Sequence, residues 1–233
     1  MSRPCDVFPR ARRIHRTEGF LSLLRRGLAF LIWRLLEYQT YHIFCDDVAA
    51  LLARTEATFK PKIADFTLVF VSSNPEADEL ETRGLEFRSS IPHAKEGLSK
   101  GAIASCIFVG QELAHIGWIA LTQEAKDALN EPPFHVQFAD GEASTGQLWT
   151  HPQYQRLGLS SYGLAERARL MLEKGIKTER YAVNRRNVPT SSFTAKYDAN
   201  VCAEGRYLRV LWWKHWTERP LAPDEAVRRT ETR

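Results

Sequence analysis

The segment from Leu148 to Gly175, LWTHPQYQRLGLSSYGLAERARLMLEKG, constrains the fold more than any other part of the chain. Strand-forming residues lead into a His-Pro pair, then into a turn with one glycine and two serines, and then into a helical pattern. Small residues at such a point let the backbone approach a ligand closely, and the first N–H groups of a helix have no partner within the helix. The segment therefore predicts an anion-binding site where the helix begins.

The rest of the chain alternates strand patterns with single helices. Helices are expected over residues 74–84, with Asn74 as the N-cap, and over residues 187–197, opened by Asn187 and a proline. Runs of aromatic and β-branched residues predict single strands at 41–47, 65–72 and 179–184. Three strand pairs are also predicted: one within 101–121 that turns at Gly110 and Gln111, one within 134–150 that bends at Asp140 and Gly141, and a final hairpin within 200–216 that turns at Glu204 and Gly205. We expect an α+β fold with a mixed sheet.

The long helix of the opening segment has two predicted faces. Apolar residues at helical spacing, Leu164, Ala168, Met171 and Leu172, are expected to face the core. The charged residues between them, Glu166, Arg167, Arg169, Glu173 and Lys174, are expected to face solvent.

Cysteine usage and charge exclude several classes of protein. The four cysteines, Cys5, Cys45, Cys106 and Cys202, form no metal-binding spacing, so we expect neither a disulfide framework nor a metal site, and a reducing, cytoplasmic compartment. The formal net charge is +4, and residues 1–37 alone hold eight arginines against three acidic residues. Because the basic residues gather in that segment, the folded part is not expected to bind nucleic acid.

Residues 18–39 read as an amphipathic helix. Arginines interrupt its apolar residues, so it is too short to cross a bilayer, and no signal-peptide cleavage pattern follows it. Phe30 and Trp33 share a side with arginines, which suits peripheral contact of residues 18–37 with the inner face of a membrane. Packing on the domain or on a second copy is the alternative. We expect a basic segment (1–37), one domain (38–216) and a mobile polar tail (217–233).

The order of these elements and two motifs resemble the GNAT superfamily of N-acetyltransferases over roughly residues 65–213. The acyl-CoA loop of that family matches Gln155, Arg156, Leu157, Gly158, Leu159 and Ser160, with Ser161 following, and its second signature matches Asn187, Thr190, Thr194 and Lys196. The resemblance implies a mostly antiparallel sheet with a splayed strand pair, flanked by helices. It also implies that Leu148 and Thr150 pair with the pantetheine arm of acetyl-CoA, of another acyl-CoA or of an acyl carrier protein. An ordinary helix start capped by serine is the alternative for the loop.

The catalytic residues of the family are only partly matched. Thr194 stands where the family usually has an acid tyrosine, and Tyr197, three residues later, is the substitute we expect if the helix shifts. Glu142, with Asp140 behind it, is the candidate base, although a solvated turn would explain both. His115 is a candidate for the acceptor pocket, although a histidine satisfied within the sheet is the alternative that we favour.

The resemblance implies an N-acyltransferase in which a small-molecule primary amine attacks the thioester directly, without a metal. An amino sugar or another cell-envelope precursor is the acceptor we expect. A catalytically inert acyl-CoA-binding module and a membrane-associated interaction protein are the alternatives. Arg156, Arg185 and Arg186 are expected to meet a carrier protein or the ribose phosphate of CoA. The tryptophan-rich last strand suggests either a homodimer edge or a surface covered by the N-terminal helix.

Overall fold

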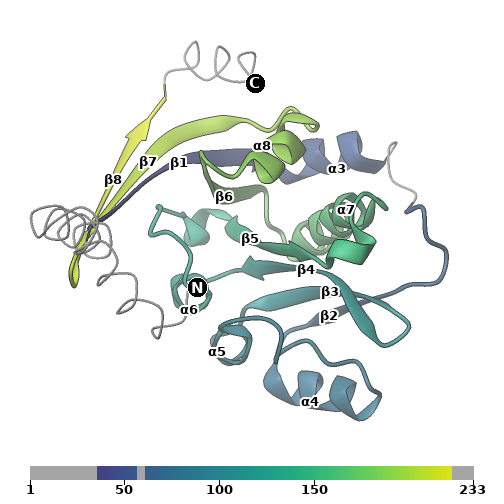
Figure 1. Cartoon of the computed structure of the whole chain (residues 1–233). Coiled ribbons are helices and arrows are strands. Elements are labelled where there is room, and N and C mark those ends of the chain that lie inside the picture. Colours follow the sequence, from purple (N-terminus) through teal and green to yellow (C-terminus); the bar gives the residue numbers. More distant parts are fainter. Residues whose placement is uncertain (1–35, 57–60, 222–233) are drawn as a thin grey trace, which may run out of the picture. The chain divides into compact units, whose positions relative to one another are not determined.

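A computed structural model describes residues 36–56 and 61–221 (Figure 1). These residues belong to two compact units, one with residues 40–205 and 218–221, the other with residues 36–39 and 206–217. The candidate site lies entirely in the larger unit. Most of the helix expected over residues 18–39, and the tail beyond residue 221, lie outside the described residues.

One sheet contains eight strands among the described residues, in the order β2-β3-β4-β5-β6-β1-β7-β8. β5 and β6 pair in parallel, whereas β1–β6, β2–β3, β3–β4 and β4–β5 pair antiparallel. The expected mixed, mostly antiparallel sheet is therefore confirmed. The strands are β1 (Leu36–Asp47), β2 (Thr67–Val71), β3 (Ile103–Val109), β4 (Glu112–Ala120), β5 (Glu142–Thr150), β6 (Thr178–Asn184), β7 (Val201–Val210) and β8 (Trp213–Pro220).

Helices cover both faces of β2 to β5. On one face, Leu80, Leu98 and Ala125 of three short helices pack with the buried Trp118 of β4. On the other face, Leu164 and Met171 of the long helix α7 pack with residues of α3 and the sheet. The helices are α3 (Val48–Glu56), α4 (Asn74–Thr82), α5 (Ala94–Ser99), α6 (Gln123–Ala128), α7 (Leu159–Glu173) and α8 (Val188–Ala195), with 3-10 turns at Phe138–Asp140 and Pro152–Tyr154.

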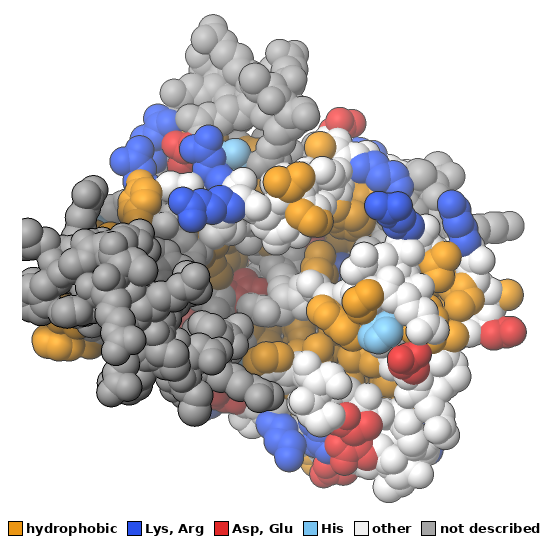
Figure 2. Space-filling view, viewed as in Figure 1, with side chains coloured by type: hydrophobic (Ala, Val, Ile, Leu, Met, Phe, Trp, Pro, Cys, Tyr) orange, Lys and Arg blue, Asp and Glu red, His pale blue; other side chains and the backbone are white. Residues whose placement is uncertain are grey.

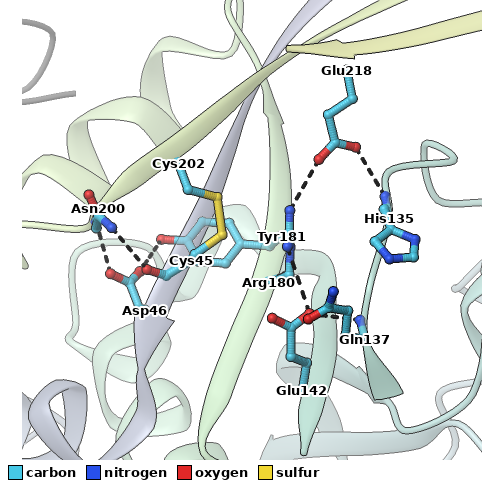
Figure 3. The surroundings of a disulfide bond; sticks show 10 residues. All are labelled: Cys45, Asp46, His135, Gln137, Glu142, Arg180, Tyr181, Asn200, Cys202 and Glu218. Atoms are coloured by element: carbon cyan, nitrogen blue, oxygen red, sulfur yellow. Dashed lines mark hydrogen bonds and ion pairs between the residues drawn. A yellow bond between two sulfur atoms is a disulfide. The ribbon is translucent and has the colours of Figure 1, made fainter. Parts of the chain in front are cut away.

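Only one strand of the pair predicted within residues 134–150 forms. Residues 134–137 alternate between buried and exposed like a strand. The two exposed residues, however, donate their N–H groups to side chains rather than to a neighbouring strand. The N–H of His135 donates to Glu218 Oε2 at 3.1 Å, and the N–H of Gln137 donates to Glu142 Oε2 at 2.7 Å (Figure 3). Residues 134–137 therefore show the burial pattern of a strand, but no strand among the described residues pairs with them.

Three predicted boundaries are also wrong. The final hairpin turns at Leu211 and Trp212, because Gly205 is buried within β7, and β8 then continues to Pro220, inside the predicted tail. Residues 36–39, predicted as helix, belong to β1, whose hydrogen bonds to neighbouring strands outweigh the helical spacing of its leucines. The N-cap of α4 is Ser73 rather than Asn74, since the Ser73 hydroxyl accepts the N–H of Glu76.

Cys45 of β1 and Cys202 of β7 form a disulfide, which corrects the expectation that the cysteines stay reduced (Figure 3). The two residues are 157 positions apart in sequence, and their Cα atoms are 5.8 Å apart. The sheet places β1 next to β7, and no spacing rule predicts that neighbourhood. Cys106 is a free, buried thiol.

Candidate active site

No side chain of the loop that precedes α7 caps the first N–H groups of that helix. Gly158 is the N-cap residue with a φ of +83°, a conformation that favours glycine, and no side chain caps the helix there. Ser160 Oγ lies 3.0 Å from Thr150 Oγ1, and Ser161 Oγ lies 2.6 Å from the Tyr197 hydroxyl. Neither serine acts as a cap, so the alternative of an ordinary serine-capped helix is wrong.

A cavity of about 380 Å³, the loop cavity, lies at this helix start. Three of its lining residues, Lys62, Arg156 and Lys196, are cations, of which only Lys62 was missed by the sequence analysis. Figure 2 shows basic side chains gathered on the part of the surface near α3. Predicted loop residues that line the cavity are Thr150, Gln155, Arg156, Gly158, Leu159, Ser160 and Ser161. Positive side chains, open N–H groups and a helix dipole together suit a phosphate group.

Three other residues predicted to contact the cofactor lie elsewhere. Leu157 packs into an apolar cluster beside the loop, and its carbonyl accepts the N–H of Lys62. Asn187 caps α8, where its side chain accepts the N–H of Thr190, and Leu148 lies half-exposed on β5. Both Asn187 and Leu148 line a second cavity. Arg185 is drawn toward Glu204, 3.8 Å away, and Arg186 lines neither cavity.

The second cavity, the cleft cavity, measures about 260 Å³ and lies where β5 and β6 diverge. The two strands pair over three residues only, from Glu142 with Thr178 to Ser144 with Arg180. Beyond that point, residues 145–148 of β5 and 181–184 of β6 line opposite walls. The expected splayed strand pair is therefore present. Phe193 of α8 lines both cavities, which makes them neighbours.

Two buried carboxyl groups line the cleft cavity, and sequence analysis missed both. Asp46 of β1 and Glu179 of β6 stand opposite each other in the antiparallel register, each only 2% exposed. Asp46 accepts hydrogen bonds from the Tyr181 hydroxyl and the N–H of Asn200, and Glu179 accepts one from the Thr145 hydroxyl. Burial, reinforced by the facing Asp46 charge, raises the pKa of Glu179 from 4.5 to about 7. Burial likewise raises the pKa of Asp46.

Arg167 of α7, predicted to face solvent, is instead buried and lines the same cavity. Gly117 of β4 leaves the space, because a Cβ there would lie 2.4 Å from Arg167 Nη1. Nη1 also donates to Ser105 Oγ at 3.3 Å. Burial lowers the pKa of Arg167 to about 10, and the charge of Glu179 opposes that shift. The guanidinium stays charged, and its charge favours the ionised form of Glu179.

The two candidate acids differ in their surroundings. Tyr197 is buried, lines the cleft cavity and lies 2.6 Å from Ser161 Oγ at the start of α7, so its hydroxyl links the two cavities. Thr194 also lines the cleft cavity, but its hydroxyl donates to the carbonyl of Ser191 one turn earlier. A phenol is the better acid of the two, so Tyr197 is the stronger candidate.

Glu142 and Asp140, the candidate bases, lie in neither cavity. Glu142 accepts the N–H of Gln137 and lies 3.8 Å from Arg180, which also reaches Glu218 (Figure 3). Asp140 is exposed in the 3-10 turn. Glu142 therefore makes a structural contact at the start of β5, and both acids lie away from the point where β5 and β6 diverge.

His115 lies in the core rather than in an acceptor pocket. Its Nδ1 is 2.8 Å from Thr150 Oγ1, its Nε2 has no partner among the described residues, and it lines neither cavity. A Cβ on Gly163 of α7 would lie 3.1 Å from the ring. Burial, with the charge of Arg167, lowers the pKa of His115 to about 3, so the ring is neutral. His115 supports Thr150, which in turn contacts Ser160.

Sequence signals for the missed residues exist but are weak. Asp46 and Glu179 are acids at the ends of otherwise apolar strand patterns, where solvent exposure is the ordinary expectation. Their roles depend on the pairing of β1 with β6, which joins segments far apart in the chain. Within residues 36–56 and 61–221, no group of His, Cys, Asp and Glu is placed to hold a metal ion. Over the same residues, no helix has the length and apolarity that a membrane crossing requires.

Comparison with known proteins gives structural likeness only. No family model matches the chain, and no curated protein matches it. A functionally unknown protein from Staphylococcus epidermidis is similar with a TM-score of 0.50 and 15% identity, covering 79% of this chain and 67% of its own. A Drosophila protein is similar with a TM-score of 0.45 and 12% identity, and the match covers 82% of this chain and 58% of that protein. A third similar structure is the C-terminal domain (DUF2156) of a putative lysylphosphatidylglycerol synthetase from Agrobacterium fabrum. Its TM-score is 0.39 and its identity 11%, and the match covers 88% of this chain and 67% of that domain. The first likeness, at its low identity, extends to the fold alone.

Proposed function

We propose that the protein transfers an acyl group from an acyl-CoA, in the first instance acetyl-CoA, to the primary amine of a small molecule. One observation carries the proposal: an uncapped, glycine-initiated helix start opens on a cation-lined cavity, beside a cleft that contains a carboxyl group with a pKa of about 7. A phosphate-binding element next to a group poised to accept a proton is what acyl transfer from CoA requires.

The donor would lie along the loop cavity and β5. The N–H groups at the start of α7 and the side chains of Lys62, Arg156 and Lys196 would hold the pyrophosphate. Beyond residue 144, β5 is released from β6, so its backbone near Leu148 and Thr150 is free on that side to pair with the pantetheine arm. An acyl carrier protein, which carries the same arm, is the second donor that this arrangement would accept.

Acceptor activation is assigned to Glu179 rather than Glu142. The amine nitrogen attacks the thioester carbonyl carbon, its proton passes to the Glu179 carboxylate, and the carbon–sulfur bond breaks to leave an amide and a thiolate. A carboxyl with a pKa near neutrality is ionised in a large fraction of molecules and still basic enough to take the proton. The Thr145 hydroxyl donates a hydrogen bond to this carboxylate, and the charge of Arg167 favours its ionised form.

Tyr197 is assigned the role of the acid that protonates the leaving thiolate. Its hydroxyl lies where the cleft cavity meets the start of α7, and Ser161 holds it there at 2.6 Å. The proton that leaves Tyr197 is replaced from solvent. Placement of the amine against an already activated thioester supplies much of the remaining rate.

The acceptor is proposed as an amino sugar or another cell-envelope precursor, handled at the cytoplasmic face of a membrane. The basic, aromatic-bearing segment of residues 18–37 supports that location by its composition. Dimerisation through the last strand is part of the same hypothesis.

Calorimetric titration of acetyl-CoA into the wild type and into Gly158→Asp tests the proposal. We expect micromolar binding to the wild type and none to Gly158→Asp, because a carboxylate at that position would meet the phosphates. Gly101→Asp is the matched control, since Gly101 has the same φ of +83° and lies outside both cavities. Release of CoA over a panel of amines then tests turnover. Binding without turnover would leave an inert module, and no binding would contradict the proposed donor site unless an acylated carrier protein binds.

A further inference from the structure

The tip of the β7–β8 ribbon exposes large apolar side chains to an unusual degree. Trp212 is 85% exposed, Trp213 51% and Leu211 47%. The unit that contains them also exposes Leu36 and Tyr38, so its sixteen described residues hold five of the nine exposed large hydrophobic side chains found in the described part of the chain. Such a concentration of exposed apolar side chains is typical of a surface that binds a protein, a ligand or a membrane.

The residues of the β7–β8 turn are not those that its backbone conformation favours. Two residues, Leu211 and Trp212, join the strands, and Leu211 has a φ of +59°. A hairpin turn with positive φ at its first position favours glycine there, and a polar residue after it. A leucine in the left-handed region is strained, and a tryptophan at the apex gains nothing from packing. The turn therefore keeps two apolar side chains that its own formation does not need.

Cations flank this apolar apex. Arg206, Arg209 and Lys214 lie in the same unit, in which Glu37 is the one acidic residue described, 2.7 Å from Arg209. Alternation along the strands puts Arg209 and Lys214 on one face of the ribbon and Val210 and Trp213 on the other, where Arg206 also lies, further from the turn. On this second face the Trp213 and His215 rings stack, with centroids 5.3 Å apart. The apex is therefore amphipathic, with aromatic and basic residues side by side.

We propose that this apex, Leu211 and Trp212 with Trp213, inserts into the interface of an anionic lipid bilayer, and that Arg206 and Lys214 contact the lipid phosphates. Tryptophan is favoured at the boundary between acyl chains and headgroups, and basic residues beside it add attraction to anionic lipids. A second copy of the chain fits less well, since pairing two such tips would bring Arg206 and Lys214 of both copies together, and among the described residues of this unit Glu37 is the one acidic residue and already contacts Arg209. This membrane contact is distinct from the catalytic proposal and stands without it.

Co-sedimentation of the full-length protein with lipid vesicles tests the inference. The probe is vesicles of equal phosphatidylcholine and phosphatidylglycerol, compared with phosphatidylcholine alone. The variant Leu211→Gly with Trp212→Asn removes both apolar side chains and installs residues that the turn prefers, so it keeps the hairpin. We expect its affinity for anionic vesicles to fall by about tenfold or more, and Arg206→Glu with Lys214→Glu to lose the preference for anionic lipid.

Leu172→Asn is the matched control, because Leu172 is an exposed leucine on α7 in the other unit. It should bind vesicles like the wild type. Quenching of tryptophan fluorescence by brominated lipid should also weaken in the turn variant. Unchanged vesicle binding by the turn variant, or no binding by the wild type, would overturn the inference. So would a wild-type dimer that the turn variant converts to monomer without any effect of lipid.

Discussion

Asp46 of β1 and Glu179 of β6 lie directly opposite each other in an antiparallel pair, and both carboxyl groups are buried. Like charges at directly opposed positions destabilise a sheet, and burial adds a desolvation cost for each ionised group. The fold accepts this arrangement at the floor of the cleft cavity, with Arg167 as the nearby cation. Such a costly arrangement is typical of sites whose chemistry requires it.

Glu179→Gln should lower the rate of acyl transfer by about 10²- to 10⁴-fold, the usual contribution of a general base. In the wild type, kcat/KM should rise with pH through about 7, as Glu179 loses its proton. The variant should show a low rate without that rise, measured as CoA release from pH 5 upward. Glu142→Gln should keep most of the activity. A larger loss of rate in Glu142→Gln than in Glu179→Gln would show that Glu142 is the base.

Stability should fall as pH rises from about 4.5 to about 7. In this window the unfolded chain gives up the Glu179 proton while the folded protein retains it, because the folded pKa is raised. Glu131, whose pKa burial also raises to about 7, adds a change of the same sign. Glu179→Gln should remove part of the loss, about 1–3 kcal/mol of unfolding free energy between pH 5 and pH 8. Urea unfolding at the two pH values measures it, and an unchanged difference in the variant would contradict the assignment.

Tyr197→Phe should reduce kcat with little change in the Kd of acetyl-CoA, since the ring packing stays and only the hydroxyl near Ser161 is lost. A loss of about 10²-fold is the expected scale for a missing general acid. Thr194→Val is the comparison, because the Thr194 hydroxyl is directed to the Ser191 carbonyl. Equal rates for Tyr197→Phe and the wild type would show that solvent protonates the thiolate.

Gly158→Ala and Gly101→Ala should cost similar stability but differ in ligand binding. Both glycines have a φ of +83°, so a Cβ at either position costs about 1–2 kcal/mol. Thermal unfolding should show comparable shifts. Calorimetry should show weakened acetyl-CoA binding for Gly158→Ala alone, because only Gly158 lines the loop cavity. Loss of binding in both variants would point to general destabilisation.

Gly117→Ala should displace Arg167, because its Cβ would lie 2.4 Å from Arg167 Nη1. We expect a cost of about 1–3 kcal/mol in unfolding free energy, typical of overpacking a core. Adding Arg167→Met should recover part of that stability, since the shorter apolar side chain leaves room for the methyl group. Simple additivity of the two substitutions would show that Gly117 and Arg167 do not interact.

The sequence by itself determined the features that depend on short spacings. The strand, the glycine turn and the long helix of residues 148–175 lie within one stretch of chain, and so does the Asn187 cap of α8. In each case the residues that make the structure are within a few positions of one another, so hydrogen-bonding capacity and periodicity suffice to place them. The mixed sheet was predicted from the order of these local elements, and the splayed strand pair from the resemblance that their motifs carry.

Only the tertiary structure decided which charged groups share the cleft. Asp46 meets Glu179 across strands 133 positions apart, and Arg167 is buried because Gly117, on another strand, leaves it space. The Cys45–Cys202 disulfide and the turn at Leu211 and Trp212 were missed for the same reason: strand neighbours fix them. A residue's own sequence neighbourhood predicts its intrinsic preference, but burial and charge pairing depend on segments that only folding brings together.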